Sequence, residues 1–271
     1  VTNSLVGELE HETWKNKNYR HHNNIKVISF MYNVMDVQRL KGLGHLPEVV
    51  DIEKEIQYKR DNFLNIKEFL KVNRTGRPER NLFMFYINRN KLYDKFKISF
   101  PELPDYTYPP MNFGDLLNID NIREVKEKCP IDIDKTDATN HGEPGFGEGN
   151  FNADLPFQPI HYKNTLISVV MCAFPFVENC CHLHSSTFNP MYCGHPILQF
   201  GPHKHLEVLR NNGFKTFDKW WDESYDELPE GWDRFKGVLK NIDILSKKSK
   251  KEIFEMYVDM KEKIINNSDL S

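Results

Sequence analysis

Two short apolar runs constrain the fold of this chain more than any other feature. They are LISVVMCAF at residues 166–174 and HPILQFG at residues 195–201, and neither contains an acidic residue, lysine or arginine. Strands this apolar are buried on both faces, which happens in parallel sheets covered by helices. The segment between them, SSTFNPMYC, predicts a crossing helix at about 186–194 with Ser185 or Ser186 as its N-cap. The two runs are therefore predicted to be neighbouring parallel strands.

The other elements extend this pattern of alternating strands and helices. A strand is predicted at 25–30, helical spacing over 46–70, and a helix at 80–88 with Pro78 near its first turn. Residues 101–160 show weak periodicity, and HGEPGFGEGN at 141–150 predicts a loop. Three helices follow, at 205–211, where Asn212-Gly213 ends the first, at 232–245 and at 247–265. The last has an apolar face formed by Ile253, Met256, Tyr257, Met260 and Ile264. The sequence thus predicts an α/β fold.

Composition sets broad limits on function. With 271 residues the chain forms one large domain or two ordinary ones, and its core needs neither a metal nor disulfides for stability. The net charge of −3 disfavours bulk binding to nucleic acid, although a local basic cluster keeps DNA open as a substrate. That cluster comprises Lys15, Lys17, Arg20, His21 and His22. The five cysteines are an odd number and include no CxxC pair, so we expect reduced thiols and a cytoplasmic protein. No apolar run is long enough to span a membrane.

Four stretches resemble a known family. They are FLKVNRTGRPERNLFMFYI at 69–87, LPFQPIHYKNTLISVV at 155–170, STFNPMYCGHPILQFG at 186–201 and LEVLRNNGFKTFDKWWDESYDE at 206–227. Together they resemble glycosyltransferases of phages, large viruses and some bacteria that are similar to α1,3-fucosyltransferases. The resemblance implies a GT-B-like α/β fold, in which two Rossmann-like halves with parallel sheets face a cleft. It implies an acceptor-side half at 1–70, either complete or truncated, a connecting segment at 71–150 and a nucleotide-sugar-binding half at 151–271.

The resemblance also implies an activity and a donor site. The activity is transfer of a sugar from a nucleotide-sugar to a modified phage DNA base, a glycan or a protein, without a metal or other cofactor, in the host cytoplasm if the protein is viral. The family motif has the form TEKTFKP, and this chain has HSSTFNP at 184–190, so serines and Asn189 replace its charged residues. The donor-binding residues that the resemblance implies are Asn73, Arg74, Arg77, Arg80, Ser185, Ser186, Thr187 and Asn189.

The chemistry of the donor explains this choice of residues. A nucleoside diphosphate leaves with developing negative charge, which helix N-termini and arginines stabilise. Because Ser185 and Ser186 cannot supply charge, it must come from Arg74, Arg77 or Arg80, whose guanidinium groups bind phosphate in bidentate fashion. Inversion at the sugar also needs a base near the acceptor. No motif selects among the candidates for this base, which are Glu8, Glu10 and Asp36.

Other interpretations remain open. Loss of the charged motif residues is also what a non-catalytic binding or scaffold protein on a decayed glycosyltransferase fold would show. Cys180, Cys181, His182 and His184 have the chemistry of zinc ligands, but their spacing is not standard and adjacent strand residues point to opposite faces. We therefore predict no metal site.

Trp220 and Trp221 either stack on sugar rings or pack between the halves. Cys172 and Cys193 are expected to be small buried hydrophobes and His195 to be structural.

Overall fold

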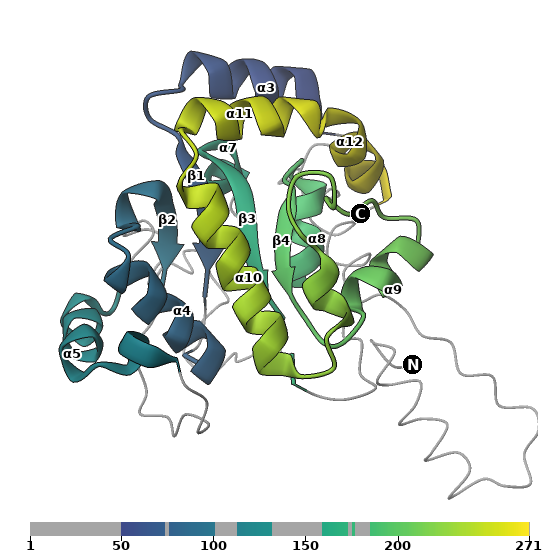
Figure 1. The fold of residues 1–271 in the computed structure, drawn as a ribbon. Helices are drawn as coiled ribbons and strands as arrows, with labels where there is room; N and C mark the ends of the chain where they lie inside the picture. The colour runs from purple at the N-terminus through teal and green to yellow at the C-terminus, as the bar shows by residue number, and fades with distance from the viewer. Residues whose placement is uncertain are drawn as a thin grey trace, which may run out of the picture.

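The computed structural model of the chain describes residues 50–73, 76–100, 113–131, 159–172, 175–176 and 185–270. Figure 1 shows helices arranged around a central sheet. The strands are β1 (Lys67–Val72), β2 (Phe96–Ser99), β3 (Thr165–Met171) and β4 (Ile197–Phe200). The α-helices are α3 (Ile52–Asp61), α4 (Pro78–Arg89), α5 (Ile119–Lys128), α7 (Pro159–Lys163), α8 (Ser185–Tyr192), α9 (His205–Asn211), α10 (Gly231–Ser246), α11 (Lys250–Asp259) and α12 (Lys261–Leu270). Three short 3-10 helices are η1 (Tyr93–Lys95), η2 (Gly114–Leu117) and η3 (Ser224–Glu227).

The sheet is parallel throughout, with the strand order β2-β1-β3-β4. β3 and β4 pair in register from Ser168 with Ile197 to Met171 with Phe200, and α8 connects them. This confirms the predicted neighbouring parallel strands and their crossing helix. The α/β class is confirmed as well. β1 spans residue 70, and the sheet joins β1 and β2 to β3 and β4, which lie beyond residue 150. The arrangement of two facing halves stays a prediction.

Helices cover both faces of the sheet. The aromatic rings of Phe83 in α4 and Phe235 in α10 pack against Phe96 and Phe200 on one face (Figure 1). On the other face, Thr187 of α8 contacts Gln199 of β4. Because side chains alternate along a strand, Phe200 and Gln199 point to opposite faces. This two-sided cover accounts for the apolar composition of β3, all of whose residues are buried.

The described part of the chain differs from the sequence prediction in several places. Helical spacing over 46–70 is wrong beyond Asp61, because Lys67–Val72 forms β1. α5 lies within a stretch where weak periodicity gave no prediction. The last predicted helix is divided at Met260 into α11 and α12, and Ser249 begins α11 with a capping box that involves Glu252. The predicted strand at 25–30 and the loop at 141–150 lie outside the described residues.

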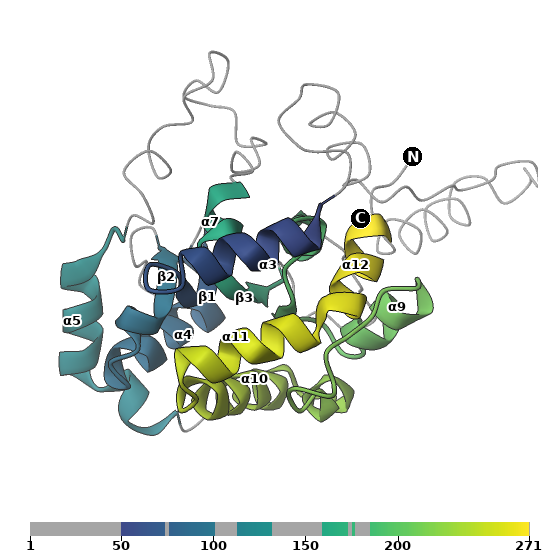
Figure 2. The ribbon, with the colours of Figure 1, turned by 90° about the horizontal axis from the view of Figure 1, so that it is seen from above.

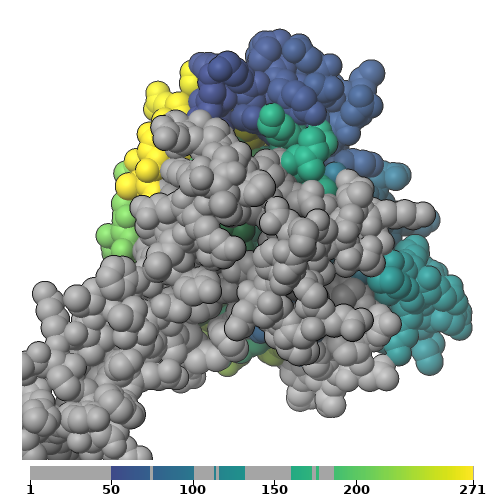
Figure 3. Space-filling view, turned by 180° about the vertical axis from the view of Figure 1, so that it is seen from behind, coloured from purple at the N-terminus to yellow at the C-terminus, as the bar shows by residue number. Residues whose placement is uncertain are grey.

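The amino end of the sheet is closed by two helices and a buried lysine. α3 and α11 run side by side there (Figures 1 and 2). From behind, α3 lies along the top of the molecule and α5 along one side (Figure 3). The Lys59 ammonium of α3 donates to the carbonyls of Tyr162, Lys163 and Thr165 at 2.6, 3.0 and 2.8 Å. Burial lowers the pKa of Lys59 to about 7, but the side chain has an acceptor for each of its three protons.

The helix after β4 has an unusual cap. The N-cap residue of α9, Lys204, has a left-handed backbone with φ 62° and makes no capping bond through its side chain. Instead, the carboxylate of Asp226, from η3, accepts the Leu206 N–H at 2.8 Å. Burial raises the pKa of Asp226 to about 6 from 3.8. A carboxylate 20 residues away in the sequence therefore accepts the backbone N–H that a local N-cap side chain usually accepts.

We expect Asp226→Asn to leave stability at pH 7 nearly unchanged, because the amide oxygen still accepts the N–H, and Asp226→Ala to cost about 1–2 kcal/mol. A carboxyl group whose pKa is raised on folding stabilises the fold as the pH falls. Wild type should therefore gain about 1 kcal/mol between pH 7 and pH 5 relative to Asp226→Asn. Urea unfolding at both pH values measures this. Identical pH dependence in the two proteins would contradict it.

Candidate functional site

The strand order places a topological switch point between β1 and β3. The chain passes from β1 outward to β2 on one side, and then returns to β3 and β4 on the other side of β1. In open parallel sheets, ligands bind at the carboxyl ends of the strands at such a point. Here α4 follows β1 and α8 follows β3, so each helix starts at this carboxyl edge. The edge between β1 and β3 is therefore the candidate functional site.

Buried charges gather beside the first turn of α4. Lys71 in β1 has 1% of its surface exposed, Glu79 has 2%, and the side chain of Arg80 has 12%. Arg80 Nε lies 3.9 Å from Glu79 Oε1, and its Nη2 donates to the Met171 carbonyl at the end of β3 at 3.5 Å. Burial lowers the pKa of Lys71 well below its usual value, and the Arg80 charge acts in the same direction. Burial raises the pKa of Glu79, so burial opposes both ionised forms.

A polar network lies at the carboxyl ends of β3 and β4. The Gln199 Nε2 lies 2.9 Å from both Cys172 Sγ and Thr187 Oγ1, and 2.6 Å from Nε2 of His205. All four side chains are buried. Burial raises the pKa of the Cys172 thiol to about 11, so it stays protonated and is a poor nucleophile. The network holds the start of α8 against the sheet and is structural. It also bears out the expectation that Cys172 is buried.

The predicted donor-binding residues that the structure describes differ in burial and in the groups they contact. Arg77 is the N-cap residue of α4, and Ser186 is exposed in the first turn of α8. Thr187 is fully buried, with its hydroxyl turned to Gln199, and Asn189 is half-buried. The Nδ2 of Asn73 donates to the Ser99 carbonyl and so joins the ends of β1 and β2. Arg74, the side chain of Ser185 and the candidate bases Glu8, Glu10 and Asp36 lie outside what the structure describes.

His195 is structural, as predicted. Its Nε2 lies 2.7 Å from the Tyr162 carbonyl and 2.9 Å from that of Thr165, while its Nδ1 lies 3.0 Å from Ser168 Oγ. With Nε2–H as donor, Nδ1 accepts from the hydroxyl and every polar atom of the ring has a partner. The ring lies near Lys59 at the amino end of the sheet, away from the candidate site.

The two tryptophans have different surroundings, and the Trp220 ring contacts side chains of α11 and α12. Trp221 is buried and stacks at an angle on Phe217. Trp220 donates its Nε1–H to Asp259, and the ammonium groups of Lys219 and Lys263 lie 5.0 and 5.3 Å from its ring centre. Cations already occupy the surroundings of the Trp220 ring, which leaves it poorly suited to stack on a sugar.

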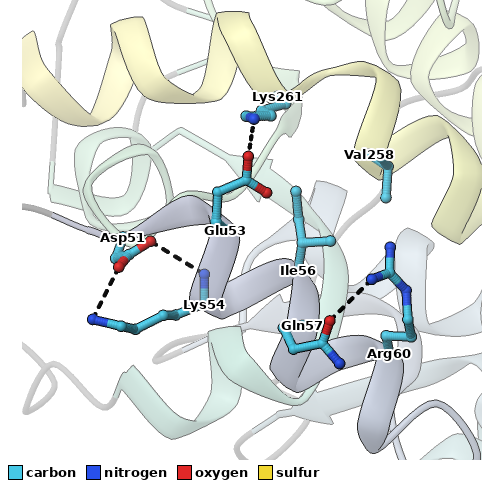
Figure 4. Close-up of a pocket in the computed structure, with 8 residues that line it drawn as sticks. All are labelled: Asp51, Glu53, Lys54, Ile56, Gln57, Arg60, Val258 and Lys261. Atoms are coloured by element: carbon cyan, nitrogen blue, oxygen red, sulfur yellow. Dashed lines mark hydrogen bonds and ion pairs between the residues drawn. The ribbon is translucent and has the colours of Figure 1, made fainter.

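A hollow of about 460 Å³ lies on the surface between α3 and α11 (Figure 4). Each of its charged side chains has a polar or charged partner within the hollow. Lys261 bonds Glu53, Lys54 lies 3.0 Å from Asp51, and Arg60 donates to Gln57 at 3.0 Å. Because these side chains already bond one another and only Ile56 and Val258 add aliphatic lining, the hollow offers little to bind a ligand.

Within the described ranges, no group of three or more His, Cys, Asp and Glu side chains could hold a metal ion. Cys180, Cys181, His182 and His184 are not among the described residues. No helix in the described part of the chain is long and apolar enough to cross a bilayer.

Comparisons with known proteins return no relative. No family model matches the chain, and neither a curated protein nor a solved structure is significantly similar to it. The fold, the switch point and the chemistry of the residues gathered there therefore carry the inference of function.

Sequence reasoning did not identify Lys71, Glu79 or Gln199 as site residues. A signal for Lys71 was present. A lysine that follows the apolar residues Phe69 and Leu70 in a buried strand is unusual, because lysine is rarely buried unless it has a partner. The signal can be recognised only when KEFLKV is known to be a strand of the sheet. Gln199 gave a similar signal, as the one polar side chain of β4.

Proposed function

We propose that the chain binds a nucleotide-sugar at the carboxyl edge between β1 and β3 and transfers its sugar to an acceptor. The observation that carries the proposal is the switch point, where α4 and α8 both start and where Lys71 and Arg80 lie beside the first turn of α4. Helix N-termini and arginines together suit a diphosphate leaving group. The resemblance to phage and viral glycosyltransferases supplies the reaction. The acceptor we propose is a modified DNA base, a glycan or a protein.

Each residue of the proposed site has its own role. Arg77 and Arg80 of α4 bind the diphosphate, and Ser186 of α8 adds a hydroxyl donor from the neighbouring helix. Thr187 does not contact the donor in this proposal, because its hydroxyl is buried against Gln199. Asn73 holds the turn after β1 in place through Ser99. Transfer proceeds by direct displacement without a metal, with Glu8, Glu10 or Asp36 as the proposed base.

One observation favours a second candidate, a binding or scaffold protein on the same fold. The helix that carries a glutamate and a lysine in the family motif here carries serines, and only Ser186 is both described and exposed. Such a protein would bind neither the nucleotide nor the nucleotide-sugar. Calorimetry and thermal shifts with a panel of nucleotide-sugars and nucleoside diphosphates separate the two candidates, because a ligand that binds only the folded state raises its stability. Release of free nucleoside diphosphate in the presence of acceptor then tests transfer.

Arg77→Ala should weaken binding of the nucleoside diphosphate about 10- to 100-fold, since a charged hydrogen bond contributes about 1.5–3 kcal/mol. The matched control is Arg89→Ala, in the last turn of the same 12-residue helix and roughly 18 Å away. It should leave affinity unchanged. Ser186→Lys, which restores the lysine of the family motif, should leave the affinity for the nucleoside diphosphate unchanged or increase it. If neither the wild type nor Ser186→Lys binds any nucleotide in calorimetry, the donor site does not exist and the scaffold candidate replaces it.

A further inference from the structure

The Lys71 side chain is buried, and no described residue pairs with its ammonium. It lies on the face of the sheet that α4 covers, because it alternates with Phe69, whose ring stacks on Phe96 at 4.7 Å. Among the described residues, no group accepts a hydrogen bond from its ammonium and no acidic side chain lies within 4.0 Å of it. The charged and titratable groups that act on it are Arg80, Glu79 and Cys172. Lys71 therefore lies between the first turn of α4 and the end of β3.

The other buried lysine, Lys59, shows what is unusual here. Lys59 satisfies all three of its protons with carbonyl oxygens, whereas Lys71 satisfies none within the described residues. A buried charge without a partner costs several kcal/mol, and an apolar side chain of the same length would fill the position at no such cost. The position is consistent with an ammonium that is paired only when a ligand is present.

The surroundings specify the charge of that ligand. The N-cap residue of α4, Arg77, makes no side-chain capping bond, and Pro78 occupies the first turn. The helix dipole places partial positive charge at this end. Arg80 and a protonated Lys71 together carry two positive charges, and among the described residues only the carboxylate of Glu79, whose pKa burial raises, lies beside them. An excess of positive charge beside a helix N-terminus suits an anion with several oxygen acceptors.

We propose that Lys71 binds the diphosphate of the donor nucleotide, supplying the charge that the serines at 185 and 186 cannot. The inference rests on the proposed function, since it places a residue in the same site. Lys71 reaches the carboxyl edge from within the sheet, while Arg77 and Arg80 approach from α4. A bound diphosphate pairs the buried ammonium and offsets the cost of burying it. The chemistry recognised is the diphosphate, whether free or as part of a nucleotide.

The test uses the full chain and its Lys71→Met variant, with Lys67→Met as the matched control. Lys67 lies on the same strand, at the opposite end, and donates to the Asp94 carbonyl. Calorimetry measures binding of UDP, GDP, ADP and inorganic pyrophosphate to each protein, and urea unfolding without ligand measures stability. We expect Lys71→Met to weaken diphosphate binding about 10- to 100-fold. We also expect an unfolding midpoint no lower than that of wild type, because methionine removes a buried amine that has no partner among the described residues. Lys67→Met should bind as wild type does.

The outcomes separate this inference from the proposed function. If the wild type binds nucleoside diphosphates and Lys71→Met binds them equally well, Lys71 has no such role, although the proposed function stands. If only pyrophosphate binds and Lys71→Met abolishes that binding, the role of Lys71 stands and the nucleotide-sugar function fails. Absence of binding by every probe overturns both. A Lys71→Met variant that fails to fold or unfolds at lower urea also overturns the inference, since the ammonium would then stabilise the empty protein.

Discussion

Phe235→Ala is expected to lower the free energy of unfolding by about 3–5 kcal/mol. Phe235 lies in α10, has no exposed surface, and meets three aromatic rings at centroid distances of 5.3, 5.9 and 6.2 Å, those of Phe200, Trp232 and Phe113. Because these neighbours come from β4, α10 and the segment before η2, they cannot close together over the space that alanine leaves. The loss therefore combines lost apolar burial with a persistent cavity.

The control for this prediction lies on the same helix. Ile244 has 47% of its surface exposed, so Ile244→Ala should change stability by no more than about 0.5 kcal/mol. Urea unfolding followed by circular dichroism measures both variants. A loss below about 1.5 kcal/mol for Phe235→Ala would mean that the aromatic cluster collapses around the substitution and that α10 is held mainly by its other contacts.

The parts of the fold predicted correctly are those whose patterns are complete within a few residues. β3 and β4 are continuous apolar runs, and α10 has helical periodicity, so local sequence identifies all three. β1 was missed because it contains Glu68 and Lys71. Glu68 is tolerated in the buried strand because Lys95, 27 residues later, lies 3.3 Å from its carboxylate. A tertiary partner at that separation leaves no local signal.

The candidate site could be predicted only in outline. The resemblance to glycosyltransferases drew attention to Arg77 and Arg80, and the structure places Arg80 at the end of β3. Thr187 matches the family motif, but burial beside Gln199 is set by the pairing of β4 with β3, which residues 184–190 do not encode. The switch point itself depends on strand order. Because β1 was not recognised as a strand, neither that order nor the buried position of Lys71 could follow from the sequence.

His195→Ala is expected to lower the free energy of unfolding at pH 7 by about 3 kcal/mol. The imidazole is fully surrounded, so alanine leaves a cavity next to the Ser168 hydroxyl and the Tyr162 and Thr165 carbonyls. Buried polar groups that lose a partner cost about 1–3 kcal/mol each. Lys59 still donates to both carbonyls, which limits the loss. The Ser168 hydroxyl has no such second partner among the described residues.

The same residue should make the protein sensitive to mild acid. Burial lowers the pKa of His195 well below 6.5, and the nearby charge of Lys59 lowers it further. Below pH 6.5 the unfolded chain therefore binds a proton that the folded protein does not, so stability falls as the pH falls. Between pH 7 and pH 5 the wild type should lose about 2 kcal/mol more than His195→Ala, which cannot titrate at this position. Urea unfolding of both proteins at the two pH values measures the difference. Parallel losses would show that the folded protein accepts a charged imidazole here, and that Nδ1 does not depend on the Ser168 hydroxyl as its donor.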